Sequence, residues 1–306
     1  MENKIKVSVC VVAYNHINYL RECLDSLVNQ DVDFDYEIIV GDDASTDGTA
    51  DLVKEYSVRF PGLIVPLLHE INIGPTKNYI SVHAKATGDY VCHMDGDDVA
   101  YPGKLQKQAD FLNKNSRCVL VWHKVNVFDD LGDVSRILHN RLGEVIDVKA
   151  ITKEDILKYG MLGAHSSTMY RRCAAPDFES IKGEVLDYFV IGLILDSGNA
   201  CRIEEVLGGY RVNFRKKTLS KNKSLYFNRS PIRKLYCEHL SWFLRGKKNY
   251  EDLIFFNAFF NFLVDLRFLR PTFVYFLILT IKTFSFSGML NIPKYFSEAM
   301  KIRASS

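Results

Sequence analysis

The sequence has no closely spaced cysteines, no strong excess of charge of either sign and no long uninterrupted hydrophobic run. Its cysteines stand singly, without a C-x-x-C pair, at Cys10, Cys23, Cys92, Cys118, Cys173, Cys201 and Cys237. An odd, dispersed set argues against a disulfide framework and against a zinc site. We therefore expect free, buried thiols in a reducing compartment.

The N-terminus also lacks a recognisable export signal. It reads MENKIKVSVCVVAYN, without the charged leader, long apolar stretch and small-residue cleavage site of a signal peptide. We therefore expect the protein in the cytoplasm. The formal net charge of +2 neither favours nor excludes a nucleic-acid partner. Local patches of charge are therefore more informative about partners than the net charge.

The composition is that of an ordinary globular protein. Hydrophobic residues make up 47% of the 306 residues and charged residues 25%. A chain of this length buries a sizeable core, as one large domain or as a domain with an appendage. No internal repeat or low-complexity tract interrupts it.

Short apolar runs alternate with helical patterns over the first hundred residues. The runs predict strands at 6–13, 35–42, 62–70 and 89–94, and the intervening periodicity predicts helices at 18–30, 46–60 and 76–88. Strand–helix–strand units of this kind build a mostly parallel sheet flanked by helices. The predicted fold class is therefore α/β.

Polar residues follow three of these strands: Tyr14-Asn15, Asp42-Asp43 and the acidic run 95–98. Open parallel sheets bind ligands beyond the carboxyl ends of their strands. We therefore expect the active site at that edge.

The run MDGDD, with Asp95, Asp97 and Asp98, sets three carboxylates within four residues after a buried strand. Such oxygen ligands suit a divalent ion such as Mg²⁺ or Mn²⁺, with a phosphate group completing the site. An EF-hand does not fit, because position twelve from Asp95 is Gln106. The alternative is a solvated turn that caps the next helix.

The run GDDASTDGT contains a second pair of acids. Asp42 or Asp43 is placed to accept hydrogen bonds from a base or from ribose hydroxyls. The alternative is a cluster that caps the following helix. Ser45 and Asp47 suit that capping role, and Asp43 remains in excess.

Four segments in order, VSVCVVAYNHINYLRECLDSLVNQ, YEIIVGDDASTDGT, NIGPTKNYI and ATGDYVCHMDGDDVAYPGKL, resemble glycosyltransferase family 2. These are inverting sugar-nucleotide transferases with the Rossmann-like GT-A fold. The resemblance covers residues 5–115 closely and continues more weakly to about residue 215. It implies a nucleotide-binding half (1–115) and an acceptor-binding half (116–230) of one GT-A domain.

The resemblance also assigns roles to individual residues. It implies that the loop after the first strand and one acid of the second hold the nucleoside, a uridine in most members, and that a basic residue reaches the base or phosphates. The first acid of the D-x-D motif faces the ribose and metal, and the second ligates the metal that bridges the diphosphate. The implied nucleotide-sugar residues are Ala13, Tyr14, Asn15, Asp43, Lys77 and Asp95, and the implied metal ligands are Asp95 and Asp97. Ala13 stands where Pro or Thr is frequent, and Lys77 where Arg is frequent.

A base and a phosphate-binding cation complete the implied chemistry. Asp187 resembles the family's acid at the start of a helix and is our candidate base, although Leu186 replaces the acid that precedes it. If that register is wrong, the role passes to another acid: Glu184, Asp196 or Asp177. His165 either lines the acceptor pocket or is a structural histidine, the interpretation we favour. Arg211 opens a stretch that resembles the family's basic loop over the diphosphate, in which Lys216, Lys217 and Lys221 are alternatively plain surface residues.

The composition changes after residue 230. Aromatic-rich runs of helical length follow, which predict a helical C-terminal region at 231–306. Between residues 252 and 290 these runs are interrupted by charges and a proline, so none reaches the roughly 18–20 apolar residues that span a bilayer. The helices either pack on the catalytic domain or, at residues 252–303, also contact the inner face of the membrane through aromatic and basic side chains.

The function implied is a metal-dependent inverting glycosyltransferase. It would use Mn²⁺ or Mg²⁺ as cofactor. It would move a hexosyl or N-acetylhexosaminyl group from a nucleotide-diphospho sugar to a glycan or lipid-linked glycan, and the resemblance implies that the donor is a UDP-sugar. The setting would be surface polysaccharide synthesis (O-antigen, capsule or exopolysaccharide), with no nucleic-acid partner. Two alternatives stay open: a sugar-nucleotide nucleotidyltransferase, which usually has a Gly-rich loop where this chain reads AYNH, and a non-catalytic nucleotide-binding module.

Overall fold

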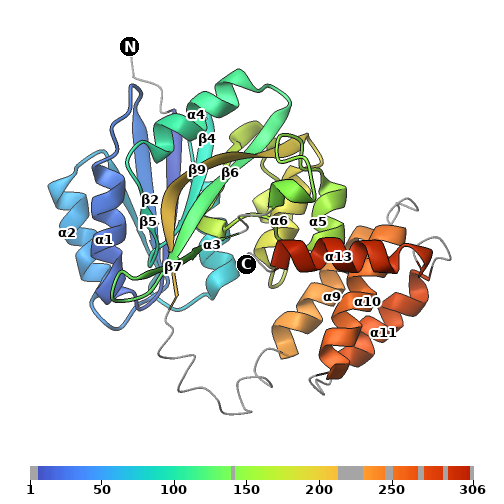
Figure 1. Cartoon of the computed structure of the whole chain (residues 1–306). Helices are drawn as coiled ribbons and strands as arrows, with labels where there is room; N and C mark the ends of the chain where they lie inside the picture. Colours follow the sequence, from blue (N-terminus) through green and yellow to red (C-terminus); the bar gives the residue numbers. More distant parts are fainter. Residues whose placement is uncertain are drawn as a thin grey trace.

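The computed structural model describes residues 6–138, 142–212, 230–244, 251–267, 272–284 and 289–303. Figure 1 shows a curved sheet between layers of helices, with further helices gathered at one end. The sheet has nine strands in the order β3-β2-β1-β4-β8-β6-β9-β5, and β7 pairs with β6.

The first half is a parallel α/β unit. Its strands are β1 (Val7–Ala13), β2 (Tyr36–Asp42), β3 (Ile64–Leu68) and β4 (Tyr90–Asp95), and its helices are α1 (Ile17–Val28), α2 (Thr49–Arg59) and α3 (Pro75–Ala84). β1 pairs in parallel with both β2 and β4, and β2 with β3. The predicted alternation of strands and helices is confirmed here.

The second half is mixed. Its strands are β5 (Val99–Ala100), β6 (Cys118–Phe128), β7 (Val134–Ile137), β8 (Met169–Arg171) and β9 (Asn199–Arg211), and its helices are α4 (Lys104–Lys114), α5 (Lys153–Tyr159) and α6 (Asp187–Ile194). Four short 3₁₀ turns, η1 (Leu142–Glu144), η2 (His165–Ser167), η3 (Arg172–Ala174) and η4 (Phe178–Ser180), connect them. β8 runs antiparallel between β4 and β6, while β6 and β9 are parallel.

Helix α1 shows why these segments fold as they do. Leu20, Cys23, Leu24 and Leu27 recur at helical spacing and are fully buried against the sheet, as their pattern predicts. Each leucine buried in this way contributes about 1.5–3 kcal/mol relative to exposure. The helix therefore has one side that can only face the core.

The C-terminal region is helical, as predicted. It consists of α9 (Ser230–Leu244), α10 (Glu251–Arg267), α11 (Phe273–Lys282) and α13 (Ile292–Arg303). Leu240, Phe243 and Ile254 share a hydrophobic cluster with Ile156 of α5 and Ile191 of α6, so these helices pack on the acceptor half (Figure 1). The domain boundary expected near residue 230 follows residues 213–229, which lie outside the described residues, and it stays a prediction.

The expectation of free thiols throughout is wrong for one pair. Cys118 and Cys201 form a disulfide between β6 and β9. These strands are neighbours in the sheet although the two cysteines are 83 residues apart in sequence, and cysteine spacing alone does not show that pairing. The other cysteines are free, and all but Cys173 are buried.

Among the described helices, none combines the length and the apolar character that crossing a bilayer requires. This agrees with the interrupted apolar runs of the C-terminal region.

Candidate active site

The carboxyl ends of the parallel strands meet at one edge of the sheet, as predicted. In the strand register, Ala13 at the end of β1 lies opposite Asp42, and Val12 lies opposite Asp95. The acids of the second and fourth strands therefore flank the loop that follows the first.

Reciprocal hydrogen bonds join the loops after β1 and β2. The backbone N–H of Asn15 donates to Ser45 Oγ at 2.9 Å, and Asn15 Oδ1 accepts from the N–H of Thr46 at 2.9 Å. Asp47 Oδ2 accepts from the first N–H of α1, at Ile17. Ser45 and Asp47 thus join two loops, and they leave Tyr14 47% exposed at the rim of the site.

Asp43 organises the segment that leads into α3. Its Oδ1 accepts from the N–H of Ile73 at 2.7 Å and its Oδ2 from the N–H of Gly74 at 3.0 Å. Gly74 has φ +89°, a conformation that residues with a Cβ adopt at a cost. Because a carboxylate has about four acceptor positions, Asp43 keeps capacity for a ligand hydroxyl or N–H.

A cavity of about 520 Å³ opens between these loops and the acid cluster. Its wall includes Ala13, Tyr14, Asp43, Asp95, Asp97 and Arg211, which are six of the residues that the sequence assigns to the nucleotide sugar and metal. We refer to it as the donor cavity. Two other assigned residues do not line it: Asn15, which holds the loops together, and Lys77, which is exposed on α3.

The acid cluster sits against β1 because Gly96 allows close approach. The N–H of Gly96 donates to Val12 O at 2.9 Å. A Cβ at this position would lie 3.0 Å from Val12 O and 2.9 Å from His16 Nδ1. The glycine between the two acids of the motif therefore lets the turn lie flat on the end of the neighbouring strand.

Asp95 is held from two sides. Ser166 Oγ accepts from the Asp95 N–H at 3.0 Å and donates to Asp95 Oδ2 at 3.2 Å, while His93 Nε2 lies 3.2 Å from Oδ1. Burial raises the pKa of Asp95, but the bond with His93 and the charges of His93 and His165 outweigh it, so this pKa lies well below its usual range. Asp95 is therefore the carboxyl of the cluster that ionises most readily.

Asp97 and Asp98 behave differently. Burial raises the pKa of both carboxyls, and the charge of Asp95 raises both further. Asp98 Oδ1 accepts from the N–H of Arg211 at 2.8 Å, which ties the end of β9 to the cluster. Three crowded carboxyls with opposed pKa shifts form a site that a cation would stabilise.

Arg211 is anchored on the acid turn. Its Nε donates to Asp97 O at 2.8 Å, its guanidinium pairs with Glu22, and it lies 4.4 Å from the ring centre of Phe128. It lines the donor cavity from the end of β9. The later lysines of the predicted basic loop, Lys216, Lys217 and Lys221, lie outside the described residues.

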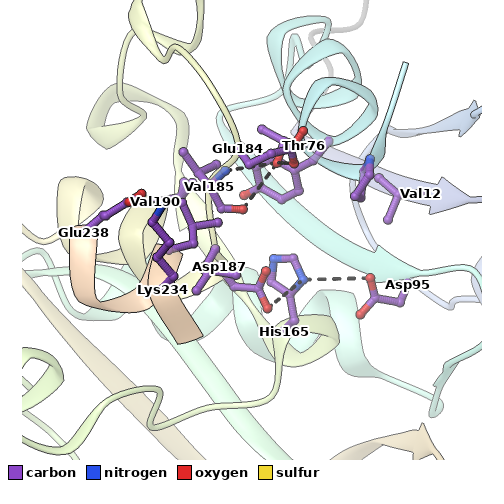
Figure 2. A pocket seen from close by; sticks show the side chains of 14 residues that line it. Val12, Thr76, Asp95, His165, Glu184, Val185, Asp187, Val190, Lys234 and Glu238 are labelled. Atoms are coloured by element: carbon purple, nitrogen blue, oxygen red, sulfur yellow. Dashed lines mark hydrogen bonds and ion pairs between the residues drawn. The ribbon is translucent and has the colours of Figure 1, made fainter. Parts of the chain in front are cut away.

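A second cavity of about 620 Å³ shares wall residues with the first, and Figure 2 shows the side chains that line it. Val12, Pro75 and Asp95 line both cavities, and Asp187, Glu184 and Thr76 line only the second. Lys234, Leu235 and Glu238 of α9 also belong to its wall, so the C-terminal region completes it. We refer to it as the acceptor cavity.

Asp187 is the first residue of α6, as predicted, and its side chain is 55% exposed in this cavity. The alternatives have other partners. Glu184 accepts from Thr76 Oγ1 at 2.7 Å, Asp196 pairs with Lys153 and Asp177 caps η4. Of the four candidate acids, Asp187 and Glu184 line this cavity, and Asp187 stays the candidate base.

His165 lies between the two carboxylates. Its Nδ1 is 3.8 Å from Asp95 Oδ1 and 3.7 Å from Asp187 Oδ2, as the dashed lines of Figure 2 show. Its ring stacks on that of His93 with 3.7 Å between centroids. His165 also lines the acceptor cavity, and both roles considered for it from the sequence stay predictions.

Two further histidines were missed from the sequence. His93 Nδ1 lies 3.0 Å from His83 Nε2, and His83 Nδ1 lies 2.8 Å from Tyr170 O–H, all buried. Burial and the neighbouring His165 lower the pKa of His93 to about 4. The signal available was the spacing of His93 and Asp95, because residues two apart on a strand share a face.

Known proteins are similar to this chain in sequence and in fold. The sequence profile of "Glycosyl transferase family 2" matches residues 8–175, more than half of the chain. The putative glycosyltransferase EpsE of Bacillus subtilis is 32% identical over 186 residues, 60% of this chain and 61% of that protein. An uncharacterized glycosyltransferase of Methanocaldococcus jannaschii is 29% identical over 92% of this chain and 94% of that protein.

Several relatives are longer than the aligned region. The chain covers 58% of the length of an uncharacterized protein of Mycobacterium tuberculosis, with which it shares 30% identity over 67% of its own length. It therefore spans less than two thirds of the first relatives it matches.

Solved structures show the same architecture. TarS of S. aureus, in complex with UDP-GlcNAc, superimposes with a TM-score of 0.62 at 17% identity, over 97% of this chain and 81% of that one. The mannosyltransferase PcManGT of Pyrobaculum calidifontis, in complex with GDP-Man and Mn²⁺, gives 0.60 at 17% identity, over 99% and 86%. These likenesses confirm the GT-A fold. The profile match over more than half of the chain shows that it belongs to glycosyl transferase family 2.

Proposed function

We propose that the protein is a metal-dependent inverting glycosyltransferase. It would move a sugar from a nucleotide-diphospho donor, a UDP-sugar, to a hydroxyl of a glycan or lipid-linked glycan in surface polysaccharide synthesis. The observation that carries this proposal is the shared wall of the two cavities: Asp95 lines both, with Asp97 on the donor side and Asp187 on the acceptor side. A donor and an acceptor bound in these cavities would meet at Asp95.

The relatives support the donor class and the setting. TarS was crystallised with UDP-GlcNAc and PcManGT with GDP-Man and Mn²⁺. The abequosyltransferase RfbV of Salmonella typhimurium is 36% identical over 95 residues, 31% of this chain and 28% of that protein. A nucleotide sugar is therefore the donor we propose, and a surface glycan the acceptor.

The residues present fit a divalent ion. Asp95 and Asp97 offer carboxylate oxygens at the donor cavity, and Asp95 also forms a cluster of possible ligand atoms with His93 and His165, all within 4.8 Å of one another. When bound, the ion would supply positive charge that stabilises the leaving diphosphate. Asp95 and Asp97 are the ligands we propose for it.

The chain's own residues would perform the remaining steps. The nucleoside would bind against Ala13, Tyr14 and Asp43, and Arg211 would add positive charge near the diphosphate. In the acceptor cavity, Asp187 would take the proton of the attacking hydroxyl as its oxygen bonds to the anomeric carbon. The bond from that carbon to the diphosphate oxygen breaks on the opposite face, and the electron pair leaves with the nucleoside diphosphate. One displacement of this kind inverts the anomeric configuration.

The C-terminal helices would hold the enzyme at the membrane surface. α11 exposes Ile278 (47%) and Ile281 (66%), with Phe284 (62%) just beyond its end and the charged end of Lys282 beside them. Apolar side chains flanked by a basic residue are typical of a segment that lies in a membrane interface. A loose contact with the inner face of the cytoplasmic membrane would place a lipid-linked acceptor within reach.

The decisive assay measures which product leaves the donor. The purified protein is incubated with a panel of UDP-sugars and Mn²⁺, and we expect slow release of UDP that an acceptor glycan accelerates. Release of pyrophosphate would instead support nucleotidyl transfer, and binding without turnover would support a nucleotide-binding module. Either of these outcomes would contradict the proposal.

A further inference from the structure

Three possible ligand atoms from two distant segments meet beside the acid cluster. His93 and Asp95 come from β4 and His165 from η2, and their ligand atoms lie within 4.8 Å of one another. Asp97 is not part of this group. The cluster contains two imidazole nitrogens and one carboxylate oxygen, so its chemistry differs from that of the all-oxygen site that the acidic run suggests.

The spacing fits ligands that share one ion. His93 Nε2 lies 3.2 Å and His165 Nδ1 3.8 Å from Asp95 Oδ1. Bonds of about 2.1 Å at right angles would place neighbouring ligand atoms about 3 Å apart. The 3.8 Å separation is too long for a direct hydrogen bond, but a small movement of the His165 ring would bring it to ligand spacing.

An outer set of hydrogen bonds fixes the ring of His93. Its Nδ1 lies 3.0 Å from His83 Nε2, and His83 Nδ1 lies 2.8 Å from Tyr170 O–H. The Nε2 atom is thereby directed at Asp95. Metal-bound histidines almost always use their second nitrogen for such a bond, which sets both tautomer and ring orientation. The chain Tyr170–His83–His93 has this form.

We propose that His93 and His165 join Asp95 as ligands of the divalent ion, which makes it a site for a transition metal such as Mn²⁺ in preference to Mg²⁺. Imidazole nitrogen binds first-row transition metals, whereas Mg²⁺ selects oxygen. The inference rests on the metal dependence in the proposed function and names ligands that the acidic motif does not contain. His83 is a positioning residue in this arrangement.

Pulsed electron paramagnetic resonance of bound Mn²⁺ tests the ligands directly. The metal-free full-length protein is titrated with Mn²⁺, alone and with UDP, and electron spin echo modulation reports any ¹⁴N bound to the ion. We expect nitrogen modulation in the unmodified protein and its reduction in His165→Ala. His69→Ala is the matched control, because His69 is a partly buried histidine bonded to Ser81 outside both cavities.

A second variant separates positioning from ligation. His83→Leu leaves both proposed nitrogen ligands in place but removes the partner of His93 Nδ1, because leucine has no polar side-chain atom. We expect it to keep the nitrogen modulation and to weaken Mn²⁺ binding by about 10- to 100-fold. Circular dichroism verifies that each variant is folded. The His165 side chain is 13% exposed and that of His93 only 1%, so the His165 variant keeps the test usable if substitutions at the more buried histidines unfold the protein.

The outcomes distinguish this inference from the proposed function. Mn²⁺ bound without nitrogen modulation, or no Mn²⁺ binding with or without UDP, would refute the nitrogen ligands. If the enzyme still released UDP while Mn²⁺ was bound through oxygen ligands alone, the glycosyltransferase proposal would stand. Nitrogen-bound Mn²⁺ with no release of nucleoside diphosphate from any sugar nucleotide would support the site and refute the proposed function.

Discussion

The carboxylates of Asp95 and Asp187 lie on opposite sides of one atom, His165 Nδ1, at 3.8 and 3.7 Å. Asp95 stands at the end of a sheet strand and Asp187 at the start of a helix almost a hundred residues later in the chain. The first half of the domain, which carries Asp95, and the second half, which carries Asp187, therefore meet at this imidazole. The predictions below follow from that meeting point and from the contacts that hold it.

Replacing Asp187 tests the base. In Asp187→Asn the amide cannot accept a proton, so we expect kcat to fall by about 10²- to 10⁴-fold while the KM for the donor is unchanged. Steady-state UDP release measures both constants. Asp177→Asn is the control, since Asp177 caps η4 and lines neither cavity. Equal turnover in Asp187→Asn and the unmodified enzyme would assign the base elsewhere.

Replacing Asp97 or removing metal tests the ion. We expect a chelator to stop UDP release and added Mn²⁺ to restore it. Asp97→Asn should lower Mn²⁺-stimulated turnover by roughly 100-fold or more, because charge stabilisation by a metal contributes several kcal/mol. Asp51→Asn, at an exposed acid of α2 paired with Lys54, should behave as the unmodified enzyme. Full activity after chelation would show that no metal is needed.

Thr76 of α3 holds the segment before α6 in the wall of the acceptor cavity. Its Oγ1 donates to Glu184 Oε2 at 2.7 Å and accepts from the N–H of Val185 at 3.1 Å. Thr76→Val removes both hydrogen bonds, at a cost of roughly 0.5–1.5 kcal/mol for each. We expect the KM for the acceptor to rise about tenfold without a change in UDP affinity, measured by calorimetry. Thr76→Ser keeps the hydroxyl and should restore the KM; if it behaves like Thr76→Val, packing rather than hydrogen bonding is responsible.

Glu298 attaches α13 to α5 in a pH-dependent way. Burial raises the pKa of Glu298, but hydrogen bonds from Tyr159 and Lys158 outweigh it, so the pKa lies below its usual 4.5. The carboxylate thus stabilises the fold above pH 4.5, and this contribution is lost as the pH falls below that value. Because Glu298 lies near the protein surface, with 22% of its side chain exposed, solvent screens the ion pair, and we expect Glu298→Gln to cost about 1 kcal/mol or less at neutral pH.

Thermal unfolding at several pH values measures this effect. At pH 7 the Tm of Glu298→Gln should lie below that of the unmodified protein by the largest amount. This difference in Tm should become smaller as the pH falls below 4.5. Glu70→Gln, at an exposed glutamate beyond β3, should show no such difference. A Tm difference that stayed constant down to pH 3 would contradict the assigned sign.

The exposed face of α11 predicts membrane contact. Ile281→Asp should weaken binding to vesicles that contain phosphatidylglycerol by about tenfold or more, since burying an isoleucine contributes about 1.5–3 kcal/mol. Flotation measures the bound fraction. Val58→Asp is the matched control, because Val58 is an 82% exposed apolar residue on α2, in the donor half. Equal flotation of the two variants would count against contact through α11.

Much of the first half was predictable because its signals are local. Leu20, Cys23, Leu24 and Leu27 recur with the period of a helix, and the valines of β1 form a continuous buried strand. Asp187 begins a helix, as its surroundings indicated. The edge that carries Asp43 and Asp95 followed from the rule that parallel strands end together.

Other features depend on which distant segments become neighbours. The bond between Cys118 and Cys201 exists because β6 lies beside β9, and no spacing rule expresses that pairing. The place of Lys234 in the acceptor cavity requires α9 to pack on α6, and the role of Asn15 requires the second loop to fold over the first.

The sequence by itself determined the alternating strands and helices of the first half and the family, because periodicity and short motifs depend on neighbouring residues. Only the tertiary structure decided that His83, His93 and His165 gather around Asp95. Antiparallel insertion of β8 beside β4 brings η2 to the end of that strand, where Ser166 bonds Asp95 and His165 stacks on His93. Contacts between residues some 70 positions apart depend on strand order and register, which are set by the packing of the whole sheet.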